Sequence, residues 1–201
     1  MQIVIATHNK DKFKELYSCL NTLDIELLSL DKFPQIKEII EDGETLKENA
    51  LIKARTVHRL TSLPAIADDT GLEVDALNGE PGVYTARYAG ENCSYSDNVN
   101  KMLIEMKGIP MEKRTATFRT VMAYVDKNME LTSEGLVKGM IFNEIKGLGG
   151  FGYDPIFYVV EKNKTFAEMN IEEKNLVSHR SRAIKALKSD LVYNLKLKEN
   201  A

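Results

Sequence analysis

The stretch PAIADDTGLEVDAL, residues 64–77, begins with four apolar residues and then places two carboxylates, Asp68 and Asp69, side by side. A pair of aspartates at the end of a strand is often only a turn signal. If both act chemically, they do different work, because adjacent residues on a strand point to opposite faces. One carboxylate could bind Mg²⁺, a hard cation that prefers carboxylate and phosphate oxygens, and the other could accept a proton from water.

A further carboxylate, Glu41, stands in the acidic segment IIEDGE just before a predicted helix. It is a candidate additional member of an acidic group around a metal ion. An acidic residue before a helix N-terminus is also explained by the helix dipole alone. Both interpretations stay open at this point.

The segment THNKDK, residues 7–12, joins a predicted strand to a predicted helix. The backbone N–H groups at a helix N-terminus, the neutral donors Thr7 and Asn9, and the cations Lys10 and Lys12 could together bind a phosphate group. The segment is not a Walker loop, since it lacks the Gly-Lys-Ser/Thr ending. The alternative is an asparagine helix cap beside solvated lysines.

The predicted helix of residues 44–60 carries polar side chains on its apolar side. At about 100° per residue, its apolar stripe consists of Leu46, Ala50, Val57 and Leu60. Asn49 and Lys53 fall on the same stripe. A lysine in that place needs an anionic partner or extends its ammonium group to water, and Asn49 would also need a buried partner. These two residues could therefore face a polar cleft.

Two motifs nearer the C-terminus could recognise a planar base. The glycines of GLGGFGYDPIF, residues 147–157, would let the backbone approach a ligand, and Phe151 or Tyr153 could stack on a ring. In SHRSRA, His179 and Arg180 are donors at a predicted helix start, suited to a carbonyl oxygen or a phosphate. A loose hairpin loop and a plain surface helix are the alternatives.

The elements that must position these residues form a mixed α/β pattern. Strands are predicted over residues 2–6, 25–30, 63–68, 71–77, 114–125, 131–142 and 156–160. Helices are predicted over residues 10–20, 44–60 and 94–108, the last capped by Ser96 or Asp97, and from the N-cap Ser178 onward. The chain shows no repeat or linker, so a single domain, residues 1–201, is expected.

Composition excludes several classes of protein. The 201 residues carry a formal net charge of −3. The chain therefore lacks the surplus of basic residues that general binding to nucleic acid requires. The two cysteines, Cys19 and Cys93, have neither metal-ligand nor redox spacing. The sequence shows no signal-peptide pattern and no apolar run of the roughly 18 residues that would span a membrane, and a cytoplasmic location is expected.

These segments together resemble the inosine triphosphate pyrophosphatase family, also called the dITP/XTP or non-standard purine nucleotide pyrophosphatases. The resemblance rests on six motifs in series, namely ATHNKDKFKEL, GETLKENALIKA, PAIADDTGLEVDAL, PGVYTARYAG, GGFGYDPIF and EEKNLVSHRSRA. It implies an elongated mixed α/β fold of two lobes with the nucleotide in a cleft between them, usually in a homodimer. It also implies Mg²⁺-dependent hydrolysis of ITP, dITP and XTP to the monophosphate and pyrophosphate, which cleanses the nucleotide pool.

The resemblance also implies roles for individual residues. The loop that holds the triphosphate comprises Thr7, His8, Asn9, Lys10, Asp11 and Lys12, and Lys53 meets a phosphate oxygen. Glu41, Asp68 and Asp69 form the acidic group around Mg²⁺ and the attacking water, with Asp69 as general base. Substrate also contacts Thr70; the base and sugar lie against Phe151, Gly152, Tyr153 and Asp154, and the purine's keto edge is read by Lys174, His179 and Arg180.

Other functions remain to be weighed. A pyrophosphatase for modified pyrimidine nucleotides (of the Maf-like kind) would need a different base-reading end. A nucleotide-binding sensor without turnover would share the binding residues but give no product. A purely structural or interaction protein would leave Asn49 and Lys53 on an apolar stripe without a reason.

Overall fold

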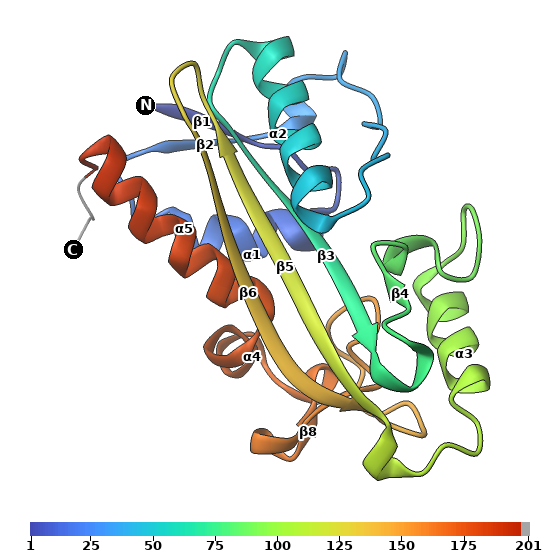
Figure 1. Cartoon of the computed structure of the whole chain (residues 1–201). Coiled ribbons are helices and arrows are strands. Elements are labelled where there is room, and N and C mark those ends of the chain that lie inside the picture. Colours follow the sequence, from blue (N-terminus) through green and yellow to red (C-terminus); the bar gives the residue numbers. More distant parts are fainter. Residues whose placement is uncertain (198–201) are drawn as a thin grey trace. The chain divides into compact units, whose positions relative to one another are not determined.

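Figure 1 shows the computed structural model of the chain, which describes residues 1–197; residues 198–201 of the expected domain lie outside the described part. Its helices are α1 (Lys10–Leu20), α2 (Leu46–Thr61), α3 (Tyr95–Glu105), α4 (Ile171–Val177) and α5 (His179–Leu195). Its strands are β1 (Gln2–Ile5), β2 (Glu26–Ser29), β3 (Ala65–Val74), β4 (Pro81–Gly82), β5 (Thr115–Val125), β6 (Glu130–Ile141), β7 (Phe157–Val159) and β8 (Lys164–Thr165). The mixed α/β class is confirmed. None of the described helices is long and apolar enough to cross a membrane.

The chain divides into two compact units. The first comprises Met1–Asp69, Thr120–Gly135 and residues 179–197, and the second comprises Thr70–Arg119 and Leu136–Ser178. Strands β3, β5 and β6 contribute residues to both. The sheet order in the first unit is β2-β1-β3-β5-β6, and in the second it is β3-β5-β6-β7-β8 with β4 paired to β3. The nucleotide cleft and the elongated shape stay predictions of the resemblance.

Parallel strands build the first unit around β1. Strand β1 pairs with β2 on one side, Val4 opposite Leu28, and with β3 on the other, Val4 opposite Ala65. Because the chain runs from β1 to β2 and then returns past β1 to β3, the strand order reverses between β1 and β3. Ligands of open α/β sheets bind at the carboxyl ends of strands at such a reversal. The segment after β1 lies at the carboxyl end of that strand. The two aspartates do not end β3, as the sequence suggested; they lie inside it, just past Ile66, the last residue that pairs with β1.

The core of the first unit packs α1 and α5 against the sheet. Its buried residues are Ile3, Ile5, Leu16, Leu20, Leu23, Ile66, Met122, Tyr124, Ala183, Ile184, Leu187 and Leu191. Figure 1 shows α1 and α5 beside each other. In β3, Ile66 belongs to this core, so side chains two residues apart from it along the strand point toward the same two helices.

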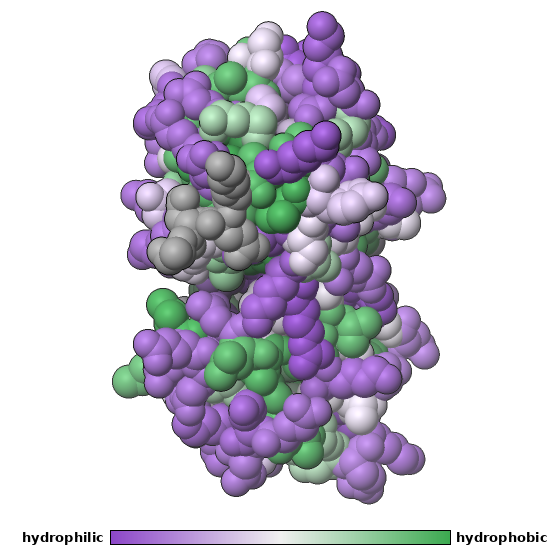
Figure 2. Space-filling view, turned by 90° about the vertical axis from the view of Figure 1, so that its left-hand side faces the viewer, coloured by the Kyte–Doolittle hydropathy of each residue, from purple (hydrophilic) through white to green (hydrophobic). Residues whose placement is uncertain are grey.

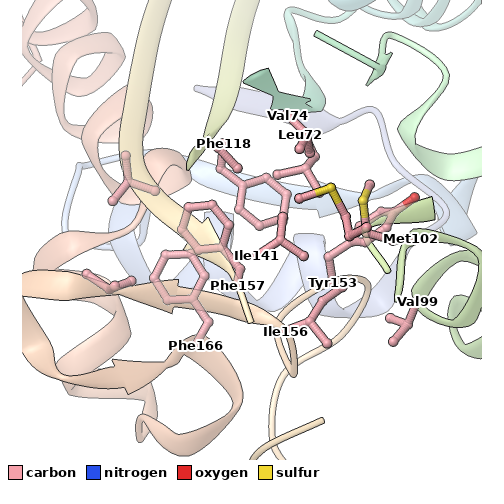
Figure 3. Close-up of a cluster of buried hydrophobic side chains, with 14 of the residues drawn as sticks. Leu72, Val74, Val99, Met102, Phe118, Ile141, Tyr153, Ile156, Phe157 and Phe166 are labelled. Carbon is pink, nitrogen blue, oxygen red and sulfur yellow. The ribbon is translucent and has the colours of Figure 1, made fainter. Parts of the chain in front are cut away.

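The core of the second unit is aromatic and rich in methionine. Figure 3 shows Phe118, Phe157 and Phe166 packed in a row, with ring centroids 4.6 Å apart for the first pair and 5.2 Å apart for the second. Met102 and Tyr153 continue the same cluster. The face in Figure 2 is mostly hydrophilic, with separate hydrophobic areas, as expected when most large apolar side chains are buried in these cores.

The structure corrects the sequence-based elements in four places. The segments 63–68 and 71–77 belong to one long strand, β3. Helix α3 is capped by Ser94, whose side chain accepts from the Asp97 N–H, rather than by Ser96 or Asp97. Helix α4 was not expected. Leu60 is 52% exposed because it lies in the last turn of α2, so it is not part of the buried stripe.

Candidate functional site

The two aspartates at residues 68 and 69 face different partners, as the alternation of a strand predicts. Asp68 has the parity of Ile66 and faces the side of the sheet covered by α1 and α5, where it meets Lys12 and Arg180. Asp69 faces the other side, where it meets Lys53 of α2. The two carboxylates are adjacent in sequence, but their ion-pair partners lie on opposite sides of the sheet.

Asp68 is a buried carboxylate with two cationic neighbours. Its Oδ2 lies 3.1 Å from the Lys12 ammonium nitrogen and 3.4 Å from Nε of Arg180. Burial alone would raise the pKa of Asp68, but Lys12, Arg180 and Lys53 together hold that pKa well below its usual range. Asp68 is therefore ionised at neutral pH and fixes two cations from two different helices.

Arg180 is held from a second side by Glu15 of α1. Its Nη1 lies 2.5 Å from Glu15 Oε2, and the Arg180 side chain is only 3% exposed. A guanidinium with carboxylates on two edges is confined in orientation, because its donors form a rigid fork. Arg180 thus belongs to the cluster of Lys12 and Asp68, in the first unit.

Lys53 joins the other carboxylates. Its ammonium nitrogen lies 2.6 Å from Glu41 Oε2 and 3.2 Å from Asp69 Oδ1. Burial opposes the charge, yet Asp69, Glu41 and Asp68 raise the pKa of Lys53, so the lysine stays protonated. Burial raises the pKa of Glu41, and Lys53 only partly offsets this. Of the two alternatives for the lysine on the apolar stripe, the structure shows the one with anionic partners.

The second oxygen of Asp69 is the unusual atom of this group. Asp69 is 8% exposed, and Oδ2 is buried without a hydrogen-bond donor among residues 1–197. A buried carboxylate oxygen in that state needs a water molecule, a proton or a cation. The donor set of Asp69 and Glu41 therefore fits a hard cation such as Mg²⁺.

The three expected metal-binding carboxylates do not form one cluster. Within the described residues, no three His, Cys, Asp or Glu side chains are grouped as ligands of one metal ion. Asp68 points toward Lys12 and Arg180 and away from the side of Glu41 and Asp69, because it has the opposite parity in β3. The metal-binding role of Glu41, Asp68 and Asp69 stays a prediction, and the structure shows that Asp68 has partners of its own.

The loop before α1 is a helix cap as well as a polar strand end. Asn9 Oδ1 accepts from the N–H groups of Asp11 and Lys12 at 2.9 and 3.2 Å. Thr7 Oγ1 accepts from the Asn9 N–H at 3.1 Å. Side chains of His8, Lys10 and Asp11 are exposed. The cap interpretation is thus confirmed for Asn9, and it orients the first turn that carries Lys12 toward Asp68.

In the second unit, Asp154 fastens the glycine-rich loop. Its Oδ2 accepts from the Phe151 N–H at 2.9 Å and from the Lys174 ammonium at 2.8 Å. That ammonium lies 4.9 Å from the centroid of the Phe151 ring. A side chain on Gly150 would collide with the Asp154 carboxylate, and the φ of Gly150 is +71°, so glycine is required there. Asp154 is 3% exposed and positions both Phe151 and Lys174.

The two aromatic residues of this loop have different surroundings. Tyr153 is 3% exposed and its hydroxyl donates to the Thr85 carbonyl at 3.1 Å, so it is a core residue. Phe151 is partly exposed, which makes it the ring able to stack on a base. Gly152 and Thr70 are also partly exposed, and both lie in the second unit.

The start of α5 is fixed by its contact with β6. A Cβ on Gly135 would collide with the His179 carbonyl oxygen and with the Ala183 nitrogen. Ser133 Oγ donates to the Ala183 carbonyl at 2.8 Å. The helix backbone therefore rests directly on the strand, and this contact places His179, which is 3% exposed, and Arg180.

Comparison with known proteins identifies the family. A model of the Ham1 family matches residues 3–190. The chain belongs to the Ham1 family. A dITP/XTP pyrophosphatase of Geobacter sulfurreducens is 49% identical over 94% of this chain and 96% of its own length. The Ham1 protein of Coxiella burnetii has a TM-score of 0.88 at 39% identity and covers 96% of this chain and 99% of its own. The Ham1 protein of Staphylococcus aureus has a TM-score of 0.86 at 38% identity, over 95% and 98% of the two chains.

The family resemblance inferred from the six motifs is confirmed by the Ham1 match. Sequence reasoning nevertheless missed Glu15 in this Ham1-family chain. Its spacing held a signal, since Glu15 follows Lys12 by three residues and shares its helical face. It also missed that Asp154 bonds to Phe151 and Lys174, since the resemblance implied only a contact of Asp154 with the base and sugar.

Proposed function

We propose that this Ham1-family protein hydrolyses non-standard purine nucleoside triphosphates, namely dITP, XTP and ITP, to the monophosphate and pyrophosphate. Support comes from the relatives named dITP/XTP pyrophosphatase, which match nearly the whole chain at 42–49% identity. The physical observation that carries the proposal is the arrangement at residue 69, where one carboxylate oxygen is held by a lysine and the other is buried and open to a new partner.

In this proposal Asp69 accepts the proton of the attacking water at Oδ2. Lys53 holds Oδ1 at 3.2 Å, so the carboxylate is oriented and only Oδ2 remains available. Water attacks the α-phosphorus, the bond to the bridging oxygen breaks, and pyrophosphate leaves with that oxygen. A positioned base of this kind contributes about 10²- to 10⁴-fold to the rate.

Glu41 would hold Mg²⁺ in the loaded enzyme, and Asp69 would act beside it through the attacking water, to which its Oδ2 is assigned. When bound, Mg²⁺ would stabilise the negative charge that develops on the phosphate oxygens. We assign a different role to Asp68, which holds Lys12 and Arg180 in place through ion pairs. Lys12 and Lys53 would contact phosphate oxygens of the substrate, together with Thr7 and Asn9, which lie between β1 and α1.

The residues proposed for base recognition are one aromatic residue and three hydrogen-bond donors. Phe151 would stack on the purine, and Lys174, His179 and Arg180 would donate toward the 6-keto oxygen. Adenine presents an amino group at that position, so donors would face a donor. A site built to satisfy a particular hydrogen-bonding group rejects the wrong one far better than shape alone.

The cell biology of the proposal follows the family resemblance. We expect a homodimer in the cytoplasm that removes non-standard purines before they enter DNA or RNA, with no binding to nucleic acid itself. The net charge of −3 agrees with a small-molecule substrate.

A product assay tests the function directly. The protein is incubated with Mg²⁺ and each of dITP, XTP, ITP, ATP and GTP, and the products are separated by ion-exchange chromatography. Monophosphate and pyrophosphate, formed mainly from dITP, XTP and ITP, are the expected result. Diphosphate and phosphate would contradict attack at the α-phosphorus, and binding without any product would indicate a nucleotide sensor.

A further inference from the structure

Asn49 is a buried amide on α2 that contacts the loop preceding the helix. Its side chain is 2% exposed, one turn before Lys53 on the same face. Asn49 Oδ1 accepts from the backbone N–H of Gly43 at 2.8 Å. The buried amide on the apolar stripe therefore has its partner in the chain segment that carries Glu41.

Gly43 lies so close to α2 that only glycine fits. A Cβ there would lie 2.7 Å from Asn49 Oδ1 and 2.7 Å from the Cβ of Glu48. Real Cβ atoms essentially never show such contacts. The loop and the helix meet at the level of the backbone, and the Asn49 hydrogen bond holds them together.

Three consecutive backbone N–H groups of this loop are held by side chains of α2. The N–H of Gly43 donates to Asn49, and those of Glu44 and Thr45 donate to Glu48 Oε2 at 2.8 and 3.0 Å. Thr45 and Glu48 form the capping box, which already completes the helix start. The Asn49 bond is additional to the cap and reaches one residue further back, toward Glu41.

The distance along the chain makes this anchor matter for Glu41. Two residues span at most about 7 Å, so fixing Gly43 restricts where the Glu41 backbone can lie. Glu41 sits in a segment without helix or strand, and its carboxylate lies 2.6 Å from Lys53. Without the anchor, the nearest backbone N–H group bonded to α2 after Glu41 would be that of Glu44, three residues along the chain.

We propose that Asn49 is a positioning residue, which anchors Gly43 so that Glu41 stays beside Lys53 and Asp69. The inference rests on the proposed function, because it gives Glu41 a place in the acidic group of the site. It predicts that loss of the Asn49 acceptor releases residues 38–43 while α2 remains formed.

The test compares Asn49→Leu, which removes the acceptor at similar size, with Asn49→Asp, which keeps it. Thr45→Ala is the matched control, since it weakens the helix cap by about 1 kcal/mol and leaves the Asn49 bond intact. Amide hydrogen exchange, measured by mass spectrometry without nucleotide, should be faster in residues 38–43 of Asn49→Leu only. Unchanged exchange there would overturn the proposal.

A double-mutant cycle with Glu41→Gln then shows whether Asn49 acts through Glu41. Asn49→Leu should lower kcat/KM for dITP by about tenfold or more, as small misplacements in a site do, and Asn49→Asp should restore most of it. In the Glu41→Gln background the same change should add little, whereas additive losses would overturn the proposal. If wild-type protein gives no turnover, the proposed function fails, and the exchange comparison alone decides the anchoring.

Discussion

The ammonium nitrogen of Lys53 lies 3.2 Å from Oδ1 of Asp69, and the other oxygen of that carboxylate has no donor within residues 1–197. One oxygen is thereby committed to structure and the other is available for chemistry. In the proposed mechanism, this division lets one side chain be fixed at Oδ1 while Oδ2 accepts the proton of water, which a carboxylate held at both oxygens could not do.

Asp69→Asn should nearly abolish turnover and leave folding and nucleotide binding intact. The amide keeps the size of the side chain but cannot accept a proton, so kcat should fall by about 10²- to 10⁴-fold. Rates come from pyrophosphate release, and binding from calorimetry with dITP. Asp24→Asn, at an exposed position, is the control. Near wild-type turnover in Asp69→Asn would remove Asp69 from the role of base.

Lys53→Met should lose both stability and activity. It leaves Glu41 and Asp69 facing each other without a cation, and breaking a fully buried pair costs about 3 to 5 kcal/mol. Because the Glu41 side chain is 31% exposed, we expect a smaller loss of about 2 to 4 kcal/mol in the free energy of unfolding. Urea denaturation at pH 7 measures it, with exposed Lys47→Met as control.

The same variant has a predictable pH dependence. Burial raises the pKa of Glu41, and removing Lys53 raises it further, so its charged form is disfavoured in the folded state. The penalty in Lys53→Met should therefore shrink as pH falls and Glu41 takes up a proton. A variant that lost stability but kept full activity would show that Lys53 is only a packed lysine.

Asp68→Asn should destabilise the protein at neutral pH and not in acid. The folded-state pKa of Asp68 lies below its unfolded value, so its contribution is present above about pH 3.9 and is lost as pH falls further. At pH 7 the buried cation of Arg180 would lose one of its carboxylate partners, at a cost of about 2 to 4 kcal/mol. Urea denaturation at pH 7 and in acid, for this variant and for exposed Asp31→Asn, measures the difference. A loss independent of pH would contradict the charge-based explanation.

Gly135→Ala should move the start of α5. The added Cβ would collide with the His179 carbonyl oxygen, a contact that can be relieved only by displacing backbone. Overpacking of this kind costs about 1 to 3 kcal/mol, and the shift should raise KM for dITP because His179 and Arg180 move with the helix. Thermal unfolding and steady-state kinetics measure both effects, with Lys138→Ala on the exposed side of β6 as control. Unchanged KM would show that α5 tolerates the shift.

Much of the fold was predictable because the spacing of apolar residues within single helices and strands matches the residues that are buried. The spacing of Leu16 and Leu20 marked α1, and the parity of Asp68 and Asp69 predicted that they face apart. The position of Lys53 on an apolar stripe narrowed its surroundings to an anionic partner or water, and the structure shows the anionic partner. Each of these inferences needs only the geometry of one helix or one strand.

What could not be predicted depends on contacts between distant segments. Nothing local in Arg180 shows that Glu15, 165 residues away, holds its guanidinium. Tyr153 was a candidate for stacking on a base because the sequence does not distinguish an aromatic residue of the core from one that binds a ligand. The packing of the second unit shows that Tyr153 belongs to its core. The sequence also does not say which face of β3 is covered by which helix, so it could not show that Asp68 meets Lys12 and Arg180 while Asp69 meets Lys53.

Residues 68 and 69 of β3 are both aspartates, so only their positions in the alternation of the strand decide which side of the sheet each carboxylate faces. Inserting one residue before Asp68 would move it into the place of Asp69 and turn its carboxylate toward Lys53, without altering any functional side chain. Insertions and deletions upstream in this strand should therefore be far more damaging than substitutions there. The fold therefore depends on the register of β3 as well as on its composition.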